Sequence, residues 1–189
     1  MKKTFACLLA LAILIALGAS AEPAAGAKYG GSLVVATKLE PSSFNINYTW
    51  DGAVPYINRN ILSKLVAYDD STGEIYGDLA ERWENTEDLM SFTFYLREGV
   101  KWHDGEPFTS ADVKWTIENL LETGSSANGF AKVKTIKGVE TPDDLTVVLN
   151  LTEPSGVMLN NLADYYGFDI LPKHLYEGTD VQNNPANFS

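Results

Sequence analysis

The chain has 189 residues, of which 45% are hydrophobic and 11% aromatic. This is enough apolar material for a folded core, and it excludes a disordered acidic tail. The 25 acidic residues outnumber the 14 basic ones, and the net charge of −11 argues against binding to nucleic-acid phosphates or anionic lipid. The only cysteine is Cys7, so disulfide frameworks and Cys-ligated zinc are excluded beyond it.

Residues 1–21 have the pattern of a secretory signal peptide. Two lysines precede an uncharged apolar run over 5–17, which is shorter than the about 20 residues of a membrane span. The small residues of 19–21 predict cleavage after this segment, which would leave a net charge of −13, and 25–27 offer an alternative cut. No cysteine stands at the cleavage point to carry a lipid anchor. We therefore expect an exported protein, periplasmic or extracellular, that is soluble after cleavage.

The next segments predict a lead-in, a strand, a loop and a helix. Residues 22–29 are small and irregular and indicate a flexible lead-in. The β-branched run over 32–37 is typical of a strand buried on both faces. Residues 44–51 are polar and aromatic without a period, which predicts a loop, and helical spacing begins at Val54. The inward face of that helix is expected to comprise Val54, Ile57, Ile61, Leu62 and Leu65.

Alternation of apolar and polar side chains over 91–97 predicts a half-buried strand. Its inward residues are expected to be Phe92, Phe94 and Leu96. Just before it, residues 81–84 carry one basic and two acidic side chains, and we interpret these charges as a solvated helix face with local pairing.

The second half predicts a helix and a hairpin. A capping-box pattern at 109–112 indicates a helix that runs to about Leu121. Residues 133–140 and 145–151 bracket a four-residue loop and predict an antiparallel hairpin. The mixture of hairpins and helices predicts a mixed α/β (α+β) fold. The Asn-rich tail over 180–189 shows no packing pattern, and we expect the chain to stop inside a larger architecture.

Several segments carry a family signature. Residues 77–84 (GDLAERWE) lead into 91–113 (SFTFYLREGVKWHDGEPFTSADV), with 30–36 (GGSLVVA) before them and 170–175 (ILPKHL) after them. In this order they resemble the family 5 extracellular solute-binding proteins, which are the dipeptide, oligopeptide and nickel-binding components of ABC importers. The resemblance runs from about residue 30 to 189.

The resemblance implies part of a two-lobed, type II periplasmic-binding-protein clamshell that closes on its ligand. Segments of about 30–62 and 169–189 would belong to the first lobe, and about 63–168 to an extra subdomain, with the second lobe missing. Members of the family are considerably longer than 189 residues. We therefore expect a truncated form that alone binds ligand weakly or not at all.

The function implied is that of an importer's substrate-binding component, which captures peptides or related small solutes and is not an enzyme. Its partners would be the ligand and the membrane permease subunits, with no cofactor, and we expect a monomer. The nickel branch is disfavoured because the mature chain offers few soft ligands. The resemblance does not fix which solute is bound.

Capture by enclosure needs aromatic walls and hydrogen-bonding loops. The loop after the first strand lies where open sheets place ligands, and two adjacent tyrosines near the return of the chain could line the same cleft. The alternative is that these aromatic residues pack on the surface or in the core. The predicted ligand-binding residues are Asn45, Tyr48, Trp50, Asp51, Tyr165 and Tyr166.

Neither histidine predicts a metal or catalytic centre. His103 stands in a Trp-His-Asp-Gly turn, and His174 has no partners at metal-ligand spacing. Hydrolase motifs and phosphate-binding glycine loops are missing. Two alternatives to an importer component remain, namely a secreted hydrolase domain that uses His103 and a stand-alone exported interaction module.

Overall fold

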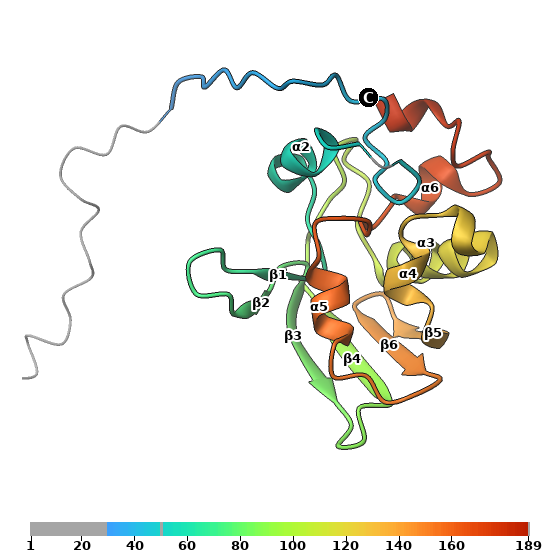
Figure 1. Ribbon diagram of the computed structural model, residues 1–189. Helices are drawn as coiled ribbons and strands as arrows, with labels where there is room; N and C mark the ends of the chain where they lie inside the picture. The colour runs from blue at the N-terminus through green and yellow to red at the C-terminus, as the bar shows by residue number, and fades with distance from the viewer. Residues whose placement is uncertain (1–29, 50, 189) are drawn as a thin grey trace, which may run out of the picture. The chain divides into compact units, whose positions relative to one another are not determined.

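A computed structural model describes residues 30–49 and 51–188 (Figure 1). The chain divides into units of residues 1–36 and 37–189, which are described separately. The predicted signal peptide, the predicted lead-in and Trp50 lie outside the described residues. Within the described part, no helix combines the length and apolarity needed to cross a bilayer.

The described part of the first unit, residues 30–36, is exposed and belongs to no strand. The prediction of a buried strand over 32–37 is therefore wrong. Leu33 is 88% exposed and Val34 93% exposed. Apolar β-branched residues favour extended backbone, but a strand also needs neighbouring strands to pair its N–H and C=O groups and to cover its side chains.

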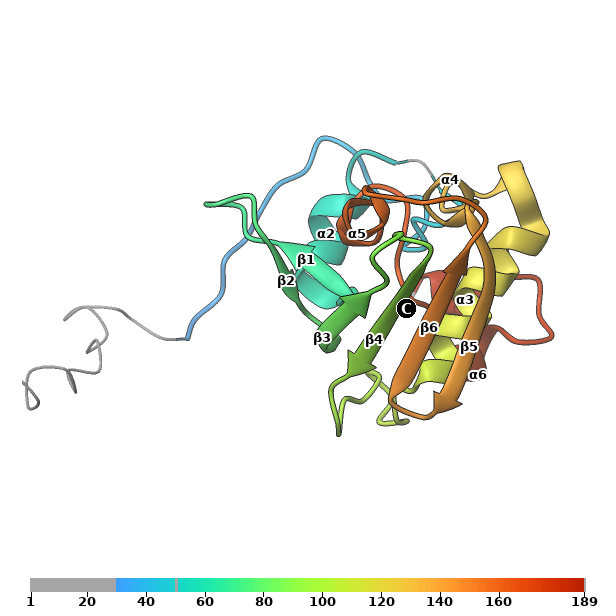
Figure 2. The same cartoon turned by 90° about the horizontal axis from the view of Figure 1, so that it is seen from below.

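The second unit contains a four-stranded antiparallel sheet with the order β3-β4-β6-β5 (Figure 2). Its strands are β3 (Ala80–Asn85), β4 (Ser91–Leu96), β5 (Ile136–Asp143) and β6 (Thr146–Leu151). Every second residue of β4 and β6 is buried, so one face of the sheet carries the core and the alternation predicted for β4 is confirmed. The buried side chains of these two strands are Phe92, Phe94, Leu96, Val147, Leu149 and Leu151.

Strand β3 corrects the interpretation of residues 81–84 as a helix face. The segment pairs with β4, Trp83 opposite Phe94, so the neighbouring strand satisfies its backbone. Arg82 pairs with Glu84 on the same face of the strand, and its guanidinium carbon lies 3.4 Å from the ring centroid of Tyr95. The charged side chains are exposed to solvent as expected, but they lie on a strand, in which every second residue shares a face, and not on a helix.

The predicted β5–β6 hairpin is confirmed with a tighter turn. Strand β5 continues to Asp143, which pairs with Thr146, so the turn has two residues where four were expected. The Asp143 carboxylate accepts hydrogen bonds from Leu145 N (2.9 Å) and Thr146 Oγ1 (3.1 Å), which holds the turn closed. At its other end the strand begins later than predicted, because helix α4 (Phe130–Val133) occupies the residues before it.

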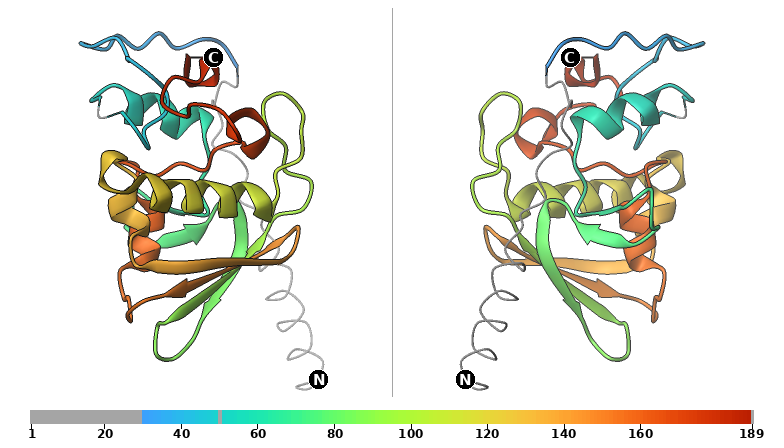
Figure 3. Two further views of the ribbon diagram at one scale, coloured as in Figure 1. Left: turned by 90° about the vertical axis from the view of Figure 1, so that its right-hand side faces the viewer. Right: turned by 90° about the vertical axis from the view of Figure 1, so that its left-hand side faces the viewer.

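Helix α3 (Ser110–Thr123) lies over the core face of the sheet and packs against β5 and β6 (Figure 3). The predicted capping box is confirmed, with Thr109 N donating to Asp112 Oδ2 at 2.9 Å. At its end, the chain turns at Gly124 with φ +64° into the 3-10 helix η1 (Gly124–Ser126). The fully buried apolar residues of α3 are Val113, Ile117 and Leu120.

The remaining elements pack beside the sheet. Strands β1 (Val66–Tyr68) and β2 (Ile75–Gly77) form a separate antiparallel pair that contacts helix α5 (Met158–Ala163). Helix α2 (Val54–Ile61) begins where predicted. Its expected inward face is partly wrong, because Ile61 is 46% exposed whereas the polar Asn58 is 4% exposed.

The tail is packed, which corrects the expectation of a segment without a packing pattern. It contains the 3-10 helix η2 (Pro185–Phe188) and contacts α6 (Lys173–Tyr176), which precedes it. Asn187 is 1% exposed, and its Oδ1 accepts hydrogen bonds from Asn45 Nδ2 (3.0 Å) and the Tyr176 hydroxyl (2.9 Å). Hydropathy patterns do not detect this packing, because side-chain amides provide the contacts.

Candidate functional site

The loop that precedes α2 is organised by Asp51. Its Oδ2 accepts a hydrogen bond from Ser42 N at 3.0 Å, and its Oδ1 accepts one from Ala53 N at 2.9 Å. These backbone donors, Ala53 first, hold the pKa of the Asp51 carboxyl below its usual range. The loop therefore presents a fixed negative charge beside the start of α2.

Asp51 and Tyr166 are brought together at a small pocket of about 50 Å³. Tyr166 is 46% exposed, and a hydrogen bond with Tyr56 raises the pKa of its hydroxyl. Asp164 Oδ1 accepts a hydrogen bond from Tyr166 N at 2.9 Å, which fixes the backbone at this wall. The other residues that line the pocket are Ile46, Thr49, Gly52 and Pro55.

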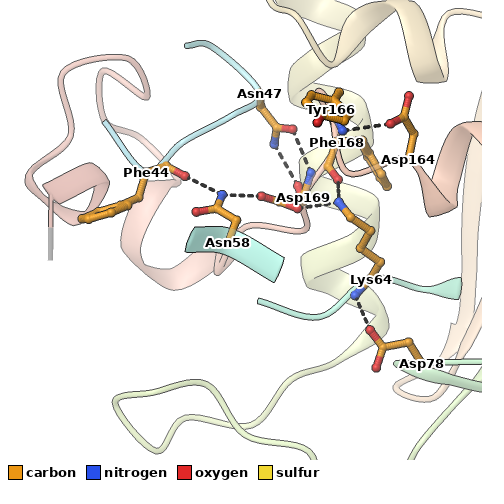
Figure 4. A network of polar contacts seen from close by, with 9 residues as sticks. All are labelled: Phe44, Asn47, Asn58, Lys64, Asp78, Asp164, Tyr166, Phe168 and Asp169. Carbon is orange, nitrogen blue, oxygen red and sulfur yellow. Dashed lines mark hydrogen bonds and ion pairs between the residues drawn. The ribbon is translucent and has the colours of Figure 1, made fainter. Parts of the chain in front are cut away.

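A buried ion pair joins Lys64, which follows α2, to the return of the chain (Figure 4). Lys64 Nζ lies 2.6 Å from Asp169 Oδ1 and also donates to the backbone oxygen of Phe168. Asp169 Oδ2 accepts a hydrogen bond from Asn58 Nδ2 at 2.7 Å. The two charged side chains are 5% and 4% exposed, so their charges are compensated by each other and by these polar neighbours.

Asn47 joins the loop to the same pair. Its Nδ2 donates to Asp169 O at 2.8 Å, and its Oδ1 accepts from Asp169 N at 3.0 Å, as a neighbouring strand would (Figure 4). Asn58 Nδ2 also donates to Phe44 O at 2.9 Å. Residues more than a hundred positions apart in the sequence thus set the position of the loop.

The other predicted site residues lie elsewhere. Asn45 is 3% exposed and is hydrogen-bonded to Asn187, and the half-buried Tyr48 points its hydroxyl at Asn119 and Thr123 of α3. Burial raises the pKa of that hydroxyl. Tyr165 faces Arg59, whose guanidinium carbon lies 4.1 Å from its ring centroid. Of the predicted set, the structure brings together Asp51 and Tyr166.

The histidines do not form a metal centre. His103 is exposed in its predicted turn. His174 Nε2 lies 2.7 Å from Asp104 Oδ2, and this contact lowers the pKa of the Asp104 carboxyl. Over the residues that the structure describes, no three His, Cys, Asp or Glu side chains come together to hold an ion.

Sequence reasoning missed the Lys64–Asp169 pair. A signal was present, since Lys64 directly precedes the apolar residues Leu65 to Ala67, and Asp169 stands between Phe168 and Ile170. A single charge inside a short apolar run indicates a buried partner of opposite sign, because isolated charges are almost never fully buried.

The chain matches known proteins in sequence and in fold. A profile of the bacterial extracellular solute-binding proteins, family 5 Middle, matches residues 74–187. A putative ABC transporter peptide-binding protein of Brucella ovis is 46% identical over 111 residues, covering 58% of this chain and 20% of that protein. Di/tripeptide-binding protein 4 of Pseudomonas aeruginosa is 34% identical over 158 residues, covering 74% of this chain and 30% of that protein.

A solved structure shares the mixed α/β fold. Haemophilus influenzae OppA, crystallised in complex with RPPGFSPFR, superposes with a TM-score of 0.66 at 27% identity, covering 73% of this chain and 30% of that chain. The chain spans less than a third of the length of each of these three proteins. Since the family profile covers more than half of the 189 residues, the chain belongs to the bacterial extracellular solute-binding proteins of family 5.

Proposed function

We propose that the chain serves in the substrate-binding component of an ABC importer that captures peptides or related small solutes. The observation that carries this proposal is the 46% identity to a putative ABC transporter peptide-binding protein. The family is one of binding proteins, and the relatives reported above are named as binding proteins and not as enzymes.

The loop that contains Asp51, together with Tyr166, would supply one wall of the ligand site. A pocket of about 50 Å³ is far below the roughly 300–1,000 Å³ of sites that enclose a ligand. The wall would therefore act with a second surface, as capture by enclosure requires. Contact of Asn45, Tyr48, Trp50 and Tyr165 with ligand remains part of the proposal. Asn45 and Tyr48 also support the loop, through their hydrogen bonds to Asn187 and Thr123.

Export, permease partners and a monomeric state complete the proposal. The family description and the sequence pattern of residues 1–21 support a site of action outside the cytoplasm. Mass spectrometry of the protein from its host tests this directly. We expect a mature chain that begins at Glu22, or at Lys28 if the alternative site is used, and an intact Met1 on an intracellular product would contradict export.

The secreted-hydrolase alternative gains no support. His103 is exposed in a turn, and its proposed role would need a nucleophile and a base held together. The stand-alone interaction module likewise has no specific observation in its favour. The importer component is therefore the function that we carry forward.

Uptake of radiolabelled trialanine by the host tests the proposed function. Deleting the gene should lower uptake, and the wild-type gene should restore it. A gene that carries Asp51→Ala and Tyr166→Ala should restore less than one that carries Lys114→Met, an exposed substitution on α3. Unchanged uptake of trialanine and of a mixed peptide pool in the deletion strain would overturn the proposal.

A further inference from the structure

A second hollow, apart from the loop pocket, lies among α2, the β1–β2 pair and Tyr165. Its volume is about 710 Å³. It is open to solvent, since Tyr56 is 62% exposed and Tyr76 is 49% exposed. The aromatic and acidic residues of its lining are Tyr56, Tyr68, Tyr76, Tyr165, Asp69 and Asp70.

The hollow already holds one guanidinium group, that of Arg59. This group lies over the Tyr165 ring, with 4.1 Å between its carbon and the ring centroid, and forms an ion pair with Asp70. Planar guanidinium groups stack on aromatic faces and pair with carboxylates in this way. The chain's own side chain therefore shows which chemistry the wall accepts.

The charges that remain at the hollow favour a further cation. Arg59 is offset by Asp70, which leaves the carboxylate of Asp69. Hydrogen bonds from the Ser71 hydroxyl (2.5 Å) and backbone N (2.8 Å) lower the pKa of Asp69, so this group stays ionised at neutral pH. Lys64, whose Nζ lies 5.7 Å from the Tyr165 centroid, is compensated by its buried partner.

The hydroxyl of Tyr76 lies close to the same negative charges. Partial burial raises the pKa of its hydroxyl, and the nearby Tyr165, then Asp78, Asp69 and Asp70, raise it further. Carboxylates that disfavour a phenolate anion favour a cation at the same place. Tyr68 is held at the wall by a hydrogen bond that its hydroxyl accepts from Asn160 Nδ2 at 2.9 Å.

We propose that this hollow binds the guanidinium group of an arginine side chain, between the tyrosine rings and the acidic residues of the β1–β2 connection. The ligand would stack on the exposed rings of Tyr56 or Tyr76 and pair with Asp69, in the manner in which Arg59 contacts Tyr165 and Asp70. The hollow shares Tyr165 with the proposed ligand contacts, and its Tyr56 is hydrogen-bonded to Tyr166 of the loop pocket. Tyr76, Asp69 and Asp70 line the hollow alone, so variants at Tyr76 separate this proposal from the proposed function.

The test is an NMR titration of the full 15N-labelled chain with Nα-acetyl-L-arginine amide. The matched control ligand is Nα-acetyl-L-citrulline amide, which has the same shape without the charge. We expect the arginine amide to shift the amide signals of β1, β2 and α2, and to bind about tenfold more tightly than citrulline amide, since cation contacts with aromatic faces and carboxylates are lost together.

Variants then locate the site. Tyr76→Ala should weaken binding of the arginine amide about two- to fivefold, the effect of losing one exposed cation–aromatic contact. Tyr95→Ala, on the outer face of the sheet, should leave it unchanged. If Tyr76→Ala loses its dispersed spectrum, Tyr56→Ala provides the same test at a more exposed ring. Equal binding of the two amides, or full affinity in the tyrosine variants, would overturn the proposal.

Discussion

Replacement of Lys64 by methionine tests whether the buried ion pair holds the site loop in place. Methionine retains an unbranched apolar side chain but removes the ammonium group that lies 2.6 Å from Asp169 Oδ1. The Asp169 side chain is 4% exposed, so its carboxylate would remain buried without a cation. Loss of one partner from such a pair costs about 3–5 kcal/mol, a large share of the roughly 5–15 kcal/mol that stabilises a folded domain.

The double variant Lys64→Met with Asp169→Asn separates the loss of the pair from the burial of an unpaired charge. The asparagine keeps an oxygen for the hydrogen bond from Asn58 and carries no charge. We expect it to recover at least about half of the loss, because removing both charges of a buried pair costs much less than removing one.

Urea unfolding, followed by tryptophan fluorescence, gives the free energy of unfolding of each variant. Lys114→Met is the matched control, since this lysine lies on the surface of α3 at 3.8 Å from Glu118. We expect that control to change stability by less than about 0.5 kcal/mol. A loss below about 1 kcal/mol for Lys64→Met at an unchanged m-value, with no recovery in the double variant, would refute the anchoring role.

Three further predictions can be tested by the same assay. Gly77→Ala should lower the free energy of unfolding by about 1–3 kcal/mol, because a Cβ there would overlap the carbonyl oxygen of Ala80. Gly138→Ala is the matched control: its Cβ would meet nothing within 4 Å, so it should be neutral or stabilising. Equal losses of stability in the two variants would contradict this. Thr109→Ala should cost about 1 kcal/mol through loss of the capping box, and an unchanged midpoint would count against that. Asp51→Ala should destabilise at pH 7, because two backbone donors lower the folded pKa of Asp51 below 3.8. The difference from the wild type should shrink as the pH falls below 3.8 and through the folded pKa. A difference that does not shrink on acidification would exclude this origin.

Local patterns predicted the elements whose structure is decided locally. The alternation in β4 and the capping box at Thr109 each identified an element and its buried side, because the required information lies within a few residues. The prediction of a strand over 32–37 was wrong for the opposite reason, since a buried strand depends on neighbouring strands that these residues do not specify. The prediction of a helix face at 81–84 was wrong because pairing with β4 decides the conformation of these residues.

The candidate site was predicted in part for the same reason. Asp51 and Tyr166 were both chosen from the sequence, but nothing local indicated that they line one pocket. The loop that carries Asp51 and the segment that carries Tyr166 are joined by hydrogen bonds between Asn47 and Asp169, which are 122 residues apart. The buried role of Asn45 likewise depends on Asn187, in a tail whose polar composition gave no sign of packing.

An NMR titration of the full 15N-labelled chain with trialanine tests most directly whether the loop around Asp51 forms a ligand wall. Enclosure by two surfaces predicts weak, millimolar binding to one wall, with shifts confined to the signals of Thr49, Asp51, Gly52 and Tyr166. Amides on the outer face of the sheet, such as that of Tyr95, should not move. Two results would contradict the account. One is trialanine binding that reaches saturation without shifting the signals of the loop, and the other is a micromolar dissociation constant for this single wall.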